Sequence, residues 1–217
     1  MARNNGIRKG TGKKVYAILV DGETEKWYLQ LMKQHESIPV DIKPDLHKKK
    51  KLKEQYVNVV EYSKHYDMVI WVVDIDKMIK EDKETKKGMV SKIKEFKGYV
   101  NKLNKLDNVK IIINTPCLEY WFLLHFNDKG KYLQTCDSVV QELKKIELLK
   151  DYKKSHTYYF KYNNDIYNKL KPNLVSAIAN ANKLGSFDFV NPESAKAEMY
   201  KIFDILNIDI TSKKYKL

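Results

Sequence analysis

Two short apolar runs that end abruptly at carboxylates constrain this chain more than any other feature. The first is VYAILVDGETE, from Val15 to Glu25, and the second is VIWVVDID, from Val69 to Asp76. Runs of this length, rich in β-branched residues and without helical spacing, are typical of strands buried on both faces of a parallel sheet. They predict an α/β fold whose acidic side chains lie at the carboxyl edge of the sheet, where such sheets bind ligands.

The rest of the chain first alternates predicted helices with predicted strands and then becomes helical. Helical spacing or strand-like runs occur in the segments 24–35, 38–42, 47–64, 90–103, 109–113 and 117–126. Gly22 is expected to supply the freedom for a sharp turn, and the polar segment Lys77 to Gly88 is expected to be a loop. Further on, Gly185 predicts a helix end, and Asn191-Pro192-Glu193 predicts the start of a helix that runs to about Leu206.

This alternation favours a mostly parallel sheet flanked by helices, with right-handed crossovers and a helical C-terminal extension. The domain organisation that we predict is a flexible basic arm over residues 1–14, an α/β domain over residues 15–130, and a helical region over residues 131–217 that packs on the same domain.

A strong positive charge favours a polyanionic partner such as nucleic acid. The chain of 217 residues has 41 Lys and Arg against 28 Asp and Glu, a formal net charge of +13. A lysine-rich proteome would give the same surplus, so both interpretations stay open. The candidate phosphate contacts are Lys48, Lys49, Lys50, Lys51, Lys53 and Lys77. The aromatic segment His156 to Tyr162 could stack nucleobases, or it could belong to the core.

The two cysteines and the apolar runs indicate where the protein works. Cys117 and Cys136 fit no metal-binding spacing and require no disulfide. No apolar run approaches the roughly 18 residues of a membrane span, and the N-terminus lacks a signal-peptide core. We therefore expect a reduced, cytoplasmic protein that does not use a membrane.

The acidic side chains at the strand ends predict a metal site. Asp21 and Glu25 follow the first strand, and Asp74 and Asp76 follow the second. Carboxylates brought together repel each other unless a cation joins them, and Mg²⁺ or Mn²⁺ prefers such oxygen ligands. Glu119 lies one turn past another strand, inside the apolar sequence CLEYWFLLHF. It either serves the same site or faces solvent from the first turn of a helix.

These motifs together resemble a known family. A strand ending in VDGETE and a strand ending in D-x-D resemble the Toprim domain of primases, topoisomerases and OLD-family nucleases. More closely, the sequences ILVDGETEKWYL, WVVDIDK, NTPCLEYWFLLHF and NPES are similar to RloB-like proteins. Such proteins occur beside a large ATPase in bacterial anti-phage loci. The resemblance spans about Val15 to Leu206.

The resemblance implies a Toprim-like fold and a nuclease site with specific residue roles. Glu25 matches the second acid of OLD-like nucleases, Asp74 and Asp76 match the D-x-D, and Glu119 lies in the helix typical of RloB-like proteins. Asp21 stands where the Toprim signature has glutamate, so its carboxylate reaches one methylene less far. Glu23 has no counterpart and is expected to face solvent.

The function we predict is a Mg²⁺- or Mn²⁺-dependent nuclease that acts on RNA, such as tRNA, or on DNA. The catalytic residues would be Asp21, Glu25, Asp74, Asp76 and Glu119, and the metal ligands Asp21, Glu25, Asp74 and Asp76. The resemblance implies an AAA or ABC-type ATPase partner and a role in defence, and a homodimer stays open. The alternative is a catalytically weak metal- and nucleic-acid-binding module that acts through its partner, which the shorter Asp21 side chain favours.

Overall fold

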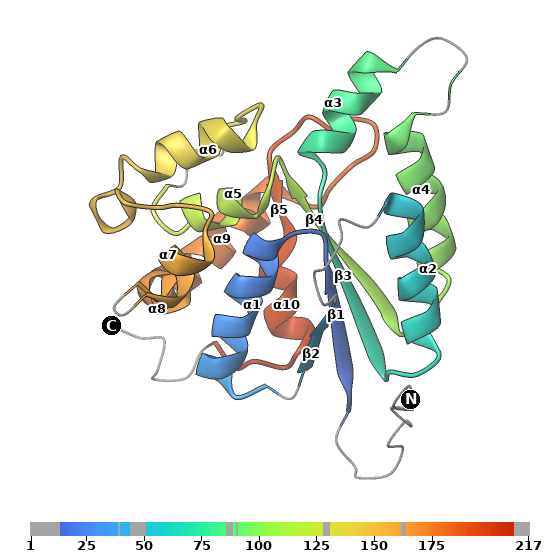
Figure 1. Cartoon of the computed structure of the whole chain (residues 1–217), viewed down its shortest axis with the longest axis horizontal. Coiled ribbons are helices and arrows are strands. Elements are labelled where there is room, and N and C mark those ends of the chain that lie inside the picture. Colours follow the sequence, from blue (N-terminus) through green and yellow to red (C-terminus); the bar gives the residue numbers. More distant parts are fainter. Residues whose placement is uncertain are drawn as a thin grey trace.

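A five-stranded sheet forms the centre of the molecule (Figure 1). The computed structural model describes residues 14–38, 40–43, 51–85, 89, 91–127, 131–161 and 164–210, and for 40–43 the backbone alone. The strand order is β2-β1-β3-β4-β5, in which the first four are parallel and β5 is antiparallel to β4. The strands are β1 Tyr16–Val20, β2 Val40–Lys43, β3 Met68–Asp74, β4 Val109–Thr115 and β5 Lys196–Ala197. The predicted α/β class with a mostly parallel sheet is confirmed.

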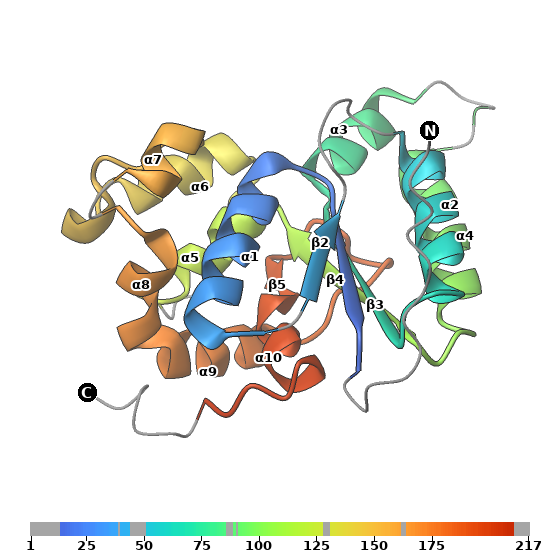
Figure 2. The same ribbon diagram turned by 60° about the horizontal axis from the view of Figure 1, so that its bottom comes forward.

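Helices cover both faces of this sheet (Figures 1 and 2). On one face lie α2 Leu52–Ser63 and α4 Lys92–Leu103. On the other face lie α1 Glu23–Glu36, α5 Leu118–Leu123, α9 Leu174–Leu184 and α10 Lys201–Ile205. Outside α1 and α5 lie α6 Cys136–Leu143, α7 His156–Phe160 and α8 Ile166–Leu170. Short 3₁₀ turns are η1 Glu147–Leu149, η2 Lys171–Asn173 and η3 Glu198–Tyr200.

Alternate side chains of the central strands enter two separate cores, as expected for strands covered on both faces. Ala17 and Leu19 of β1 pack with Trp71 of β3 under α2 and α4. Ile18 and Val20 belong to the opposite core, together with residues of α1 and α5. Every residue of β1 is buried, which explains why its sequence is a continuous apolar run.

The C-terminal helices share the core that lies under α1. Tyr28 of α1 accepts a hydrogen bond from the Trp121 indole of α5 at 2.9 Å, and Trp121 packs against Phe203 of α10. All three side chains are essentially inaccessible to solvent. Within the described ranges, no helix combines the length and the apolar character that a bilayer-spanning helix needs.

The segment predicted as a loop after β3 is largely a helix. α3 Asp76–Glu84 begins at the carboxyl edge of the sheet, and Gly88 lies outside the described residues. Ile79 is buried in the core under α4, and Met78 is partly buried against the same core. These two side chains hold a helix whose remaining residues are mostly polar. Such a short apolar face is too weak a periodic signal to detect in the sequence.

The helix predicted from Asn191 is also wrong. Residues 191–195 form turns, and the chain then adds β5 to the edge of β4, with Ala197 opposite Asn114. Glu198 accepts hydrogen bonds at 3.0 Å from the backbone amides of Ile113 and Phe187. These two contacts satisfy backbone donors in segments that are distant in sequence. A helix prediction from neighbouring residues does not reveal such contacts. The last part of the predicted helix is present, because α10 covers Lys201–Ile205.

The expectation for the cysteines is corrected as well. A disulfide joins Cys117, which precedes α5, to Cys136, the first residue of α6. The two residues are 19 positions apart in the sequence, and packing of α5 against α6 brings their Cα atoms to 5.7 Å. Spacing alone does not contain this information.

Candidate functional site

The carboxyl edge of β1 and β3 brings three buried or half-buried acids together. Asp21 directly follows β1, Glu25 lies in the first turn of α1, and Asp74 is the last residue of β3. Because β1 and β3 are parallel neighbours with Val20 opposite Val72, their ends meet at one edge. The first turn of α1 also favours the negative charge of Glu25.

Glu25 and Asp74 form the centre of this cluster, through a hydrogen bond between their carboxyl groups. Burial raises the pKa of Asp74 well above its usual value, and the charge of Glu25, this hydrogen bond and the charge of Glu119 raise it further. Burial also raises the pKa of Glu25; the hydrogen bond with Asp74 partly opposes this, while Glu119 and Asp21 add to it. Both carboxyl groups therefore keep their protons to a higher pH than usual, and a bound cation would oppose this.

Gly22 determines where the Glu25 carboxylate lies. A Cβ atom on Gly22 would be only 2.5 Å from Glu25 Oε2. The backbone of Gly22 is extended, with φ −137° and ψ 173°, so any residue could adopt it. The expectation that glycine is needed for a sharp turn is therefore wrong: it is needed because the carboxylate occupies the space of a side chain.

Two fixed donors orient Asp74. The side-chain amide of Asn114, the residue opposite Asp74 on β4, donates to Asp74 Oδ1 at 3.1 Å. The backbone amide of Leu118, at the start of α5, donates to Asp74 Oδ2 at 3.0 Å. These contacts leave two buried acceptors beside Asp74, Glu25 Oε2 and Asn114 Oδ1, with no hydrogen-bond donor among the described residues.

Asp21 is held by a chain of hydrogen bonds from the other face of the sheet. The Gln55 amide of α2 donates to Asp21 Oδ1 at 2.5 Å, and the Trp71 indole of β3 donates to Gln55 Oε1 at 3.1 Å. Trp71 is fully buried, so this chain fixes the direction of the Asp21 carboxylate.

Glu119 is completely buried, which rules out the alternative that it faces solvent. Its Oε1 accepts a hydrogen bond from the Tyr152 hydroxyl at 2.8 Å, and Tyr152 also contacts the Tyr159 hydroxyl at 2.8 Å. Its Oε2 forms an ion pair with Lys154 Nζ at 3.0 Å. Its charge contributes to the raised pKa values of Glu25 and Asp74, so it belongs to the same electrostatic cluster.

Lys154 adds a positive charge to this cluster, and no motif in the sequence indicates this role. Burial would lower the pKa of Lys154, but the carboxylates of Glu119, Asp74 and Glu25 outweigh burial and raise it. Its side chain is 39% exposed, so the ammonium group can reach a ligand at the surface. It lies among polar residues with no motif, and only the packing of the segment before α7 brings it to Glu119.

Asp76 and Glu23 occupy different places from the central acids. Asp76 is half-buried at the first position of α3, and its Oδ1 accepts a hydrogen bond from the backbone amide of Lys77 at 2.8 Å. Glu23 is exposed, as expected. Asp76 lies two residues beyond Asp74, at the start of α3, and we call this position the rim of the cluster.

The predicted phosphate-binding lysines can be followed only in part. Lys48, Lys49 and Lys50 lie outside the described residues. Lys51 and Lys53 are exposed at the beginning of α2, and Lys77 is exposed in the first turn of α3. α2 also supplies Gln55 to Asp21, so the two described lysines of α2 start the helix that contacts the acidic cluster.

The cluster provides a donor set of the kind that hard cations prefer. Its side-chain donors are carboxylate and amide oxygens, and two buried acceptors among them have no donor within the described part of the chain. Glu119 also lies close to Cys117 and Cys136, at the spacing of a metal site, but the two sulfurs form the disulfide and cannot act as thiolate ligands. The oxygen cluster is therefore the candidate site.

Residues 16–205 match the family described as RloB-like protein. The chain belongs to the RloB-like protein family. Searches of curated proteins and of solved structures found no match. In this RloB-like protein the family match contains Asp21, Glu25, Asp74 and Glu119 as well as Lys154.

Proposed function

We propose that this RloB-like protein is a metal-dependent phosphodiesterase that acts on nucleic acid. The observation that carries the proposal is that the buried Glu25 carboxyl lies next to the half-buried Asp74 carboxyl, with Asp21 and Glu119 close enough to raise the pKa of Glu25. Four acids are costly to hold in this way without a cation. A resemblance to Toprim nucleases supports the same conclusion.

The residues fit Mg²⁺ or Mn²⁺ with Glu25 and Asp74 as the principal ligands. Asn114 Oδ1 and Asp21 are further oxygen donors beside them, and Asp76 would contribute from the rim. When bound, the ion would activate water and stabilise the oxygen that leaves the phosphorus. Lys154 would neutralise a phosphate oxygen, because its ammonium group is partly exposed next to the acids. Exposed lysines would attract the nucleic-acid backbone.

The test is cleavage of labelled RNA and DNA by the purified protein in Mn²⁺ and in Mg²⁺. Asp74→Ala is expected to reduce cleavage at least about a thousandfold, because it removes the acid that Asn114 and Leu118 orient. Asp204→Ala is the matched control, since Asp204 is an exposed acid on α10. Asp76→Ala should have a smaller effect than Asp74→Ala. Equal cleavage by Asp74→Ala and the wild type would refute the proposal.

A second candidate function is a metal- and nucleic-acid-binding module without strong catalysis. Asp21 favours it, because a short carboxylate held by Gln55 is poorly placed for proton transfer. Asp21→Glu distinguishes the two functions. Faster cleavage by this variant would indicate a weakened nuclease, whereas salt-sensitive binding without cleavage by either form, with an ATPase partner present, would favour the module. Defence against phages and the ATPase partner remain part of the proposal on the resemblance alone. A cytoplasmic location remains part of it on the sequence alone.

A further inference from the structure

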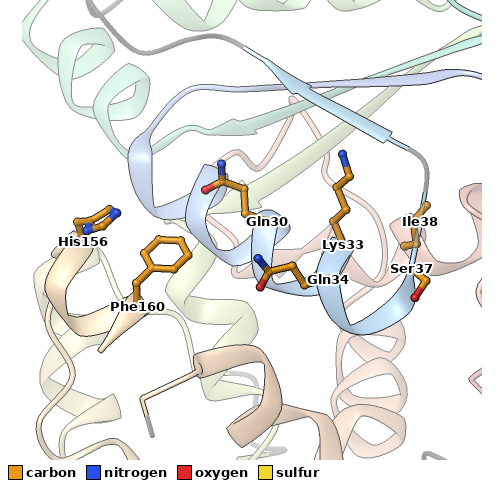
Figure 3. A pocket seen from close by; sticks show the side chains of 7 residues that line it. All are labelled: Gln30, Lys33, Gln34, Ser37, Ile38, His156 and Phe160. Carbon is orange, nitrogen blue, oxygen red and sulfur yellow. The ribbon is translucent and has the colours of Figure 1, made fainter. Parts of the chain in front are cut away.

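An open pocket of about 680 Å³ lies against α1, near the C-terminal end of the helix (Figure 3). α7 lies on one side of this pocket and contributes His156 and Phe160, whereas α1 contributes Gln30 and Gln34 from the other side. The pocket does not contain the acids. It is a separate feature of the surface, and the proposed metal site does not account for it.

The pocket and the acidic cluster share the small helix α7. Tyr159, on the buried side of α7, contacts Tyr152, which donates to Glu119. His156 and Phe160 are on the exposed side, with their ring centroids 4.7 Å apart. Trp27 of α1 contacts both sides, with His156 at 5.8 Å and Tyr159 at 5.3 Å between ring centroids. The position of the pocket is therefore rigidly related to that of the acids.

The pocket combines the groups that recognise a nucleobase. Phe160 is 39% exposed, so part of its aromatic ring is available for stacking beside the exposed ring of His156. Gln30 and Gln34 lie opposite and offer amide donors and acceptors to a base edge. Lys33 also lines the pocket and adds positive charge.

A row of polar side chains on α1 runs between the acidic cluster and the pocket. Lys26, Gln30, Lys33 and Gln34 are half-buried or exposed, at the spacing of one helical face. From Glu25 to Gln34 the helix rises roughly 14 Å at 1.5 Å per residue. A stacked single strand covers that length with about four nucleotides at 3.4 Å each.

We propose that the pocket between α1 and α7 binds one base of a single-stranded nucleic acid, up to about four nucleotides from the phosphate that lies at the acidic cluster. Only this spacing rests on the proposed function; base binding does not depend on cleavage. A base pair inside a duplex could not enter, because its faces are covered by its neighbours. The proposed substrate class is therefore single-stranded RNA or DNA, including loops.

The experiment measures fluorescence anisotropy of a labelled 12-nucleotide strand with the whole protein in EDTA, so that cleavage cannot occur. Phe160→Ala is expected to weaken binding about tenfold or more, whereas Phe160→Tyr should bind as the wild type does. Leu148→Ala is the matched control, because Leu148 is another exposed apolar residue and is 45% exposed. Circular dichroism melting of each variant shows that it is folded.

An abasic strand with the same backbone gives the decisive comparison. The wild type should bind it more weakly than the normal strand, and Phe160→Ala should no longer distinguish the two. Binding to a duplex should be the same for the wild type and Phe160→Ala. Loss of affinity by Phe160→Ala equal to that by Leu148→Ala, or equal wild-type affinity for abasic and normal strands, would overturn the inference. A failure of Mn²⁺-dependent cleavage would leave these binding results intact, so the two proposals are tested separately.

Discussion

Glu25 Oε2 lies where the side chain of residue 22 would be, and a Cβ atom on Gly22 would approach it to 2.5 Å. The glycine and the acid are thus a matched pair: the missing side chain of one makes room for the carboxylate of the other. Asp21, between β1 and α1, precedes both. In the short sequence Asp-Gly-Glu-Thr-Glu, the glycine therefore leaves the space in which the carboxylate packs at the turn.

Gly22→Ala should impair the site without unfolding the protein. The new methyl group would displace the Glu25 carboxylate from Asp74, so we expect Mn²⁺ affinity and cleavage to fall at least about tenfold. Isothermal titration with Mn²⁺ and a cleavage assay measure the two effects. Gly98→Ala is the control, because a Cβ at that position of α4 meets nothing within 4 Å. It should be stabilising by up to about 1 kcal/mol and leave the site unchanged.

Lys154→Met should separate ion binding from catalysis. Removal of the ammonium group makes the acidic cluster more negative, so Mn²⁺ should bind several-fold more tightly. Cleavage should nevertheless fall about tenfold or more, because the charge that neutralises the phosphate is lost. Glu119 is fully buried and would lose its ion-pair partner, so we expect a stability loss of up to about 3 kcal/mol, and unfolding is measured beside cleavage. Exposed Lys153→Met is the control, and unchanged cleavage by Lys154→Met would contradict this role.

His125 should make the protein sensitive to acid. Burial lowers its pKa to about 4, although hydrogen bonds to the Trp121 and Phe122 backbone oppose this. Because the unfolded chain binds this proton near pH 6.5, the stabilisation is full above pH 6.5 and is lost as pH falls towards 4. The difference amounts to about 3 kcal/mol. Urea unfolding between pH 7 and 4 should show a smaller loss in His125→Phe than in the wild type. An equal loss in His125→Phe and in the wild type would contradict this role of His125.

The disulfide should stabilise the arrangement of α5 and α6. It closes a loop between residues 19 positions apart, for which we expect about 3 kcal/mol. Urea unfolding with and without dithiothreitol measures this difference. The double variant Cys117→Ser and Cys136→Ser is the control, because the chain contains only two cysteines. It should be insensitive to dithiothreitol and resemble the reduced wild type. Equal stability of the oxidised and reduced wild type would contradict the expectation.

Local patterns in the sequence were sufficient to predict the parallel strands of the sheet and the strand-end position of the acids. β1 and β3 are continuous apolar runs because both faces are covered, and Asp21 and Asp74 follow directly from where those runs end. Gly185 also ends α9 as predicted, with φ at +70°. In contrast, β5 was missed, because its two residues exist as a strand only through pairing with β4.

By itself, the sequence determined the α/β class, the strands whose ends present Asp21 and Asp74, and the apolar character of the helix that contains Glu119. The reason is that buried strands and helices have recognisable runs or patterns of apolar residues. Only the tertiary structure decided that Lys154 pairs with Glu119, that Gln55 holds Asp21, that Cys117 meets Cys136, and that α7 faces α1 across a pocket. The physical reason is distance along the chain: each of these contacts joins segments whose local patterns are independent of one another.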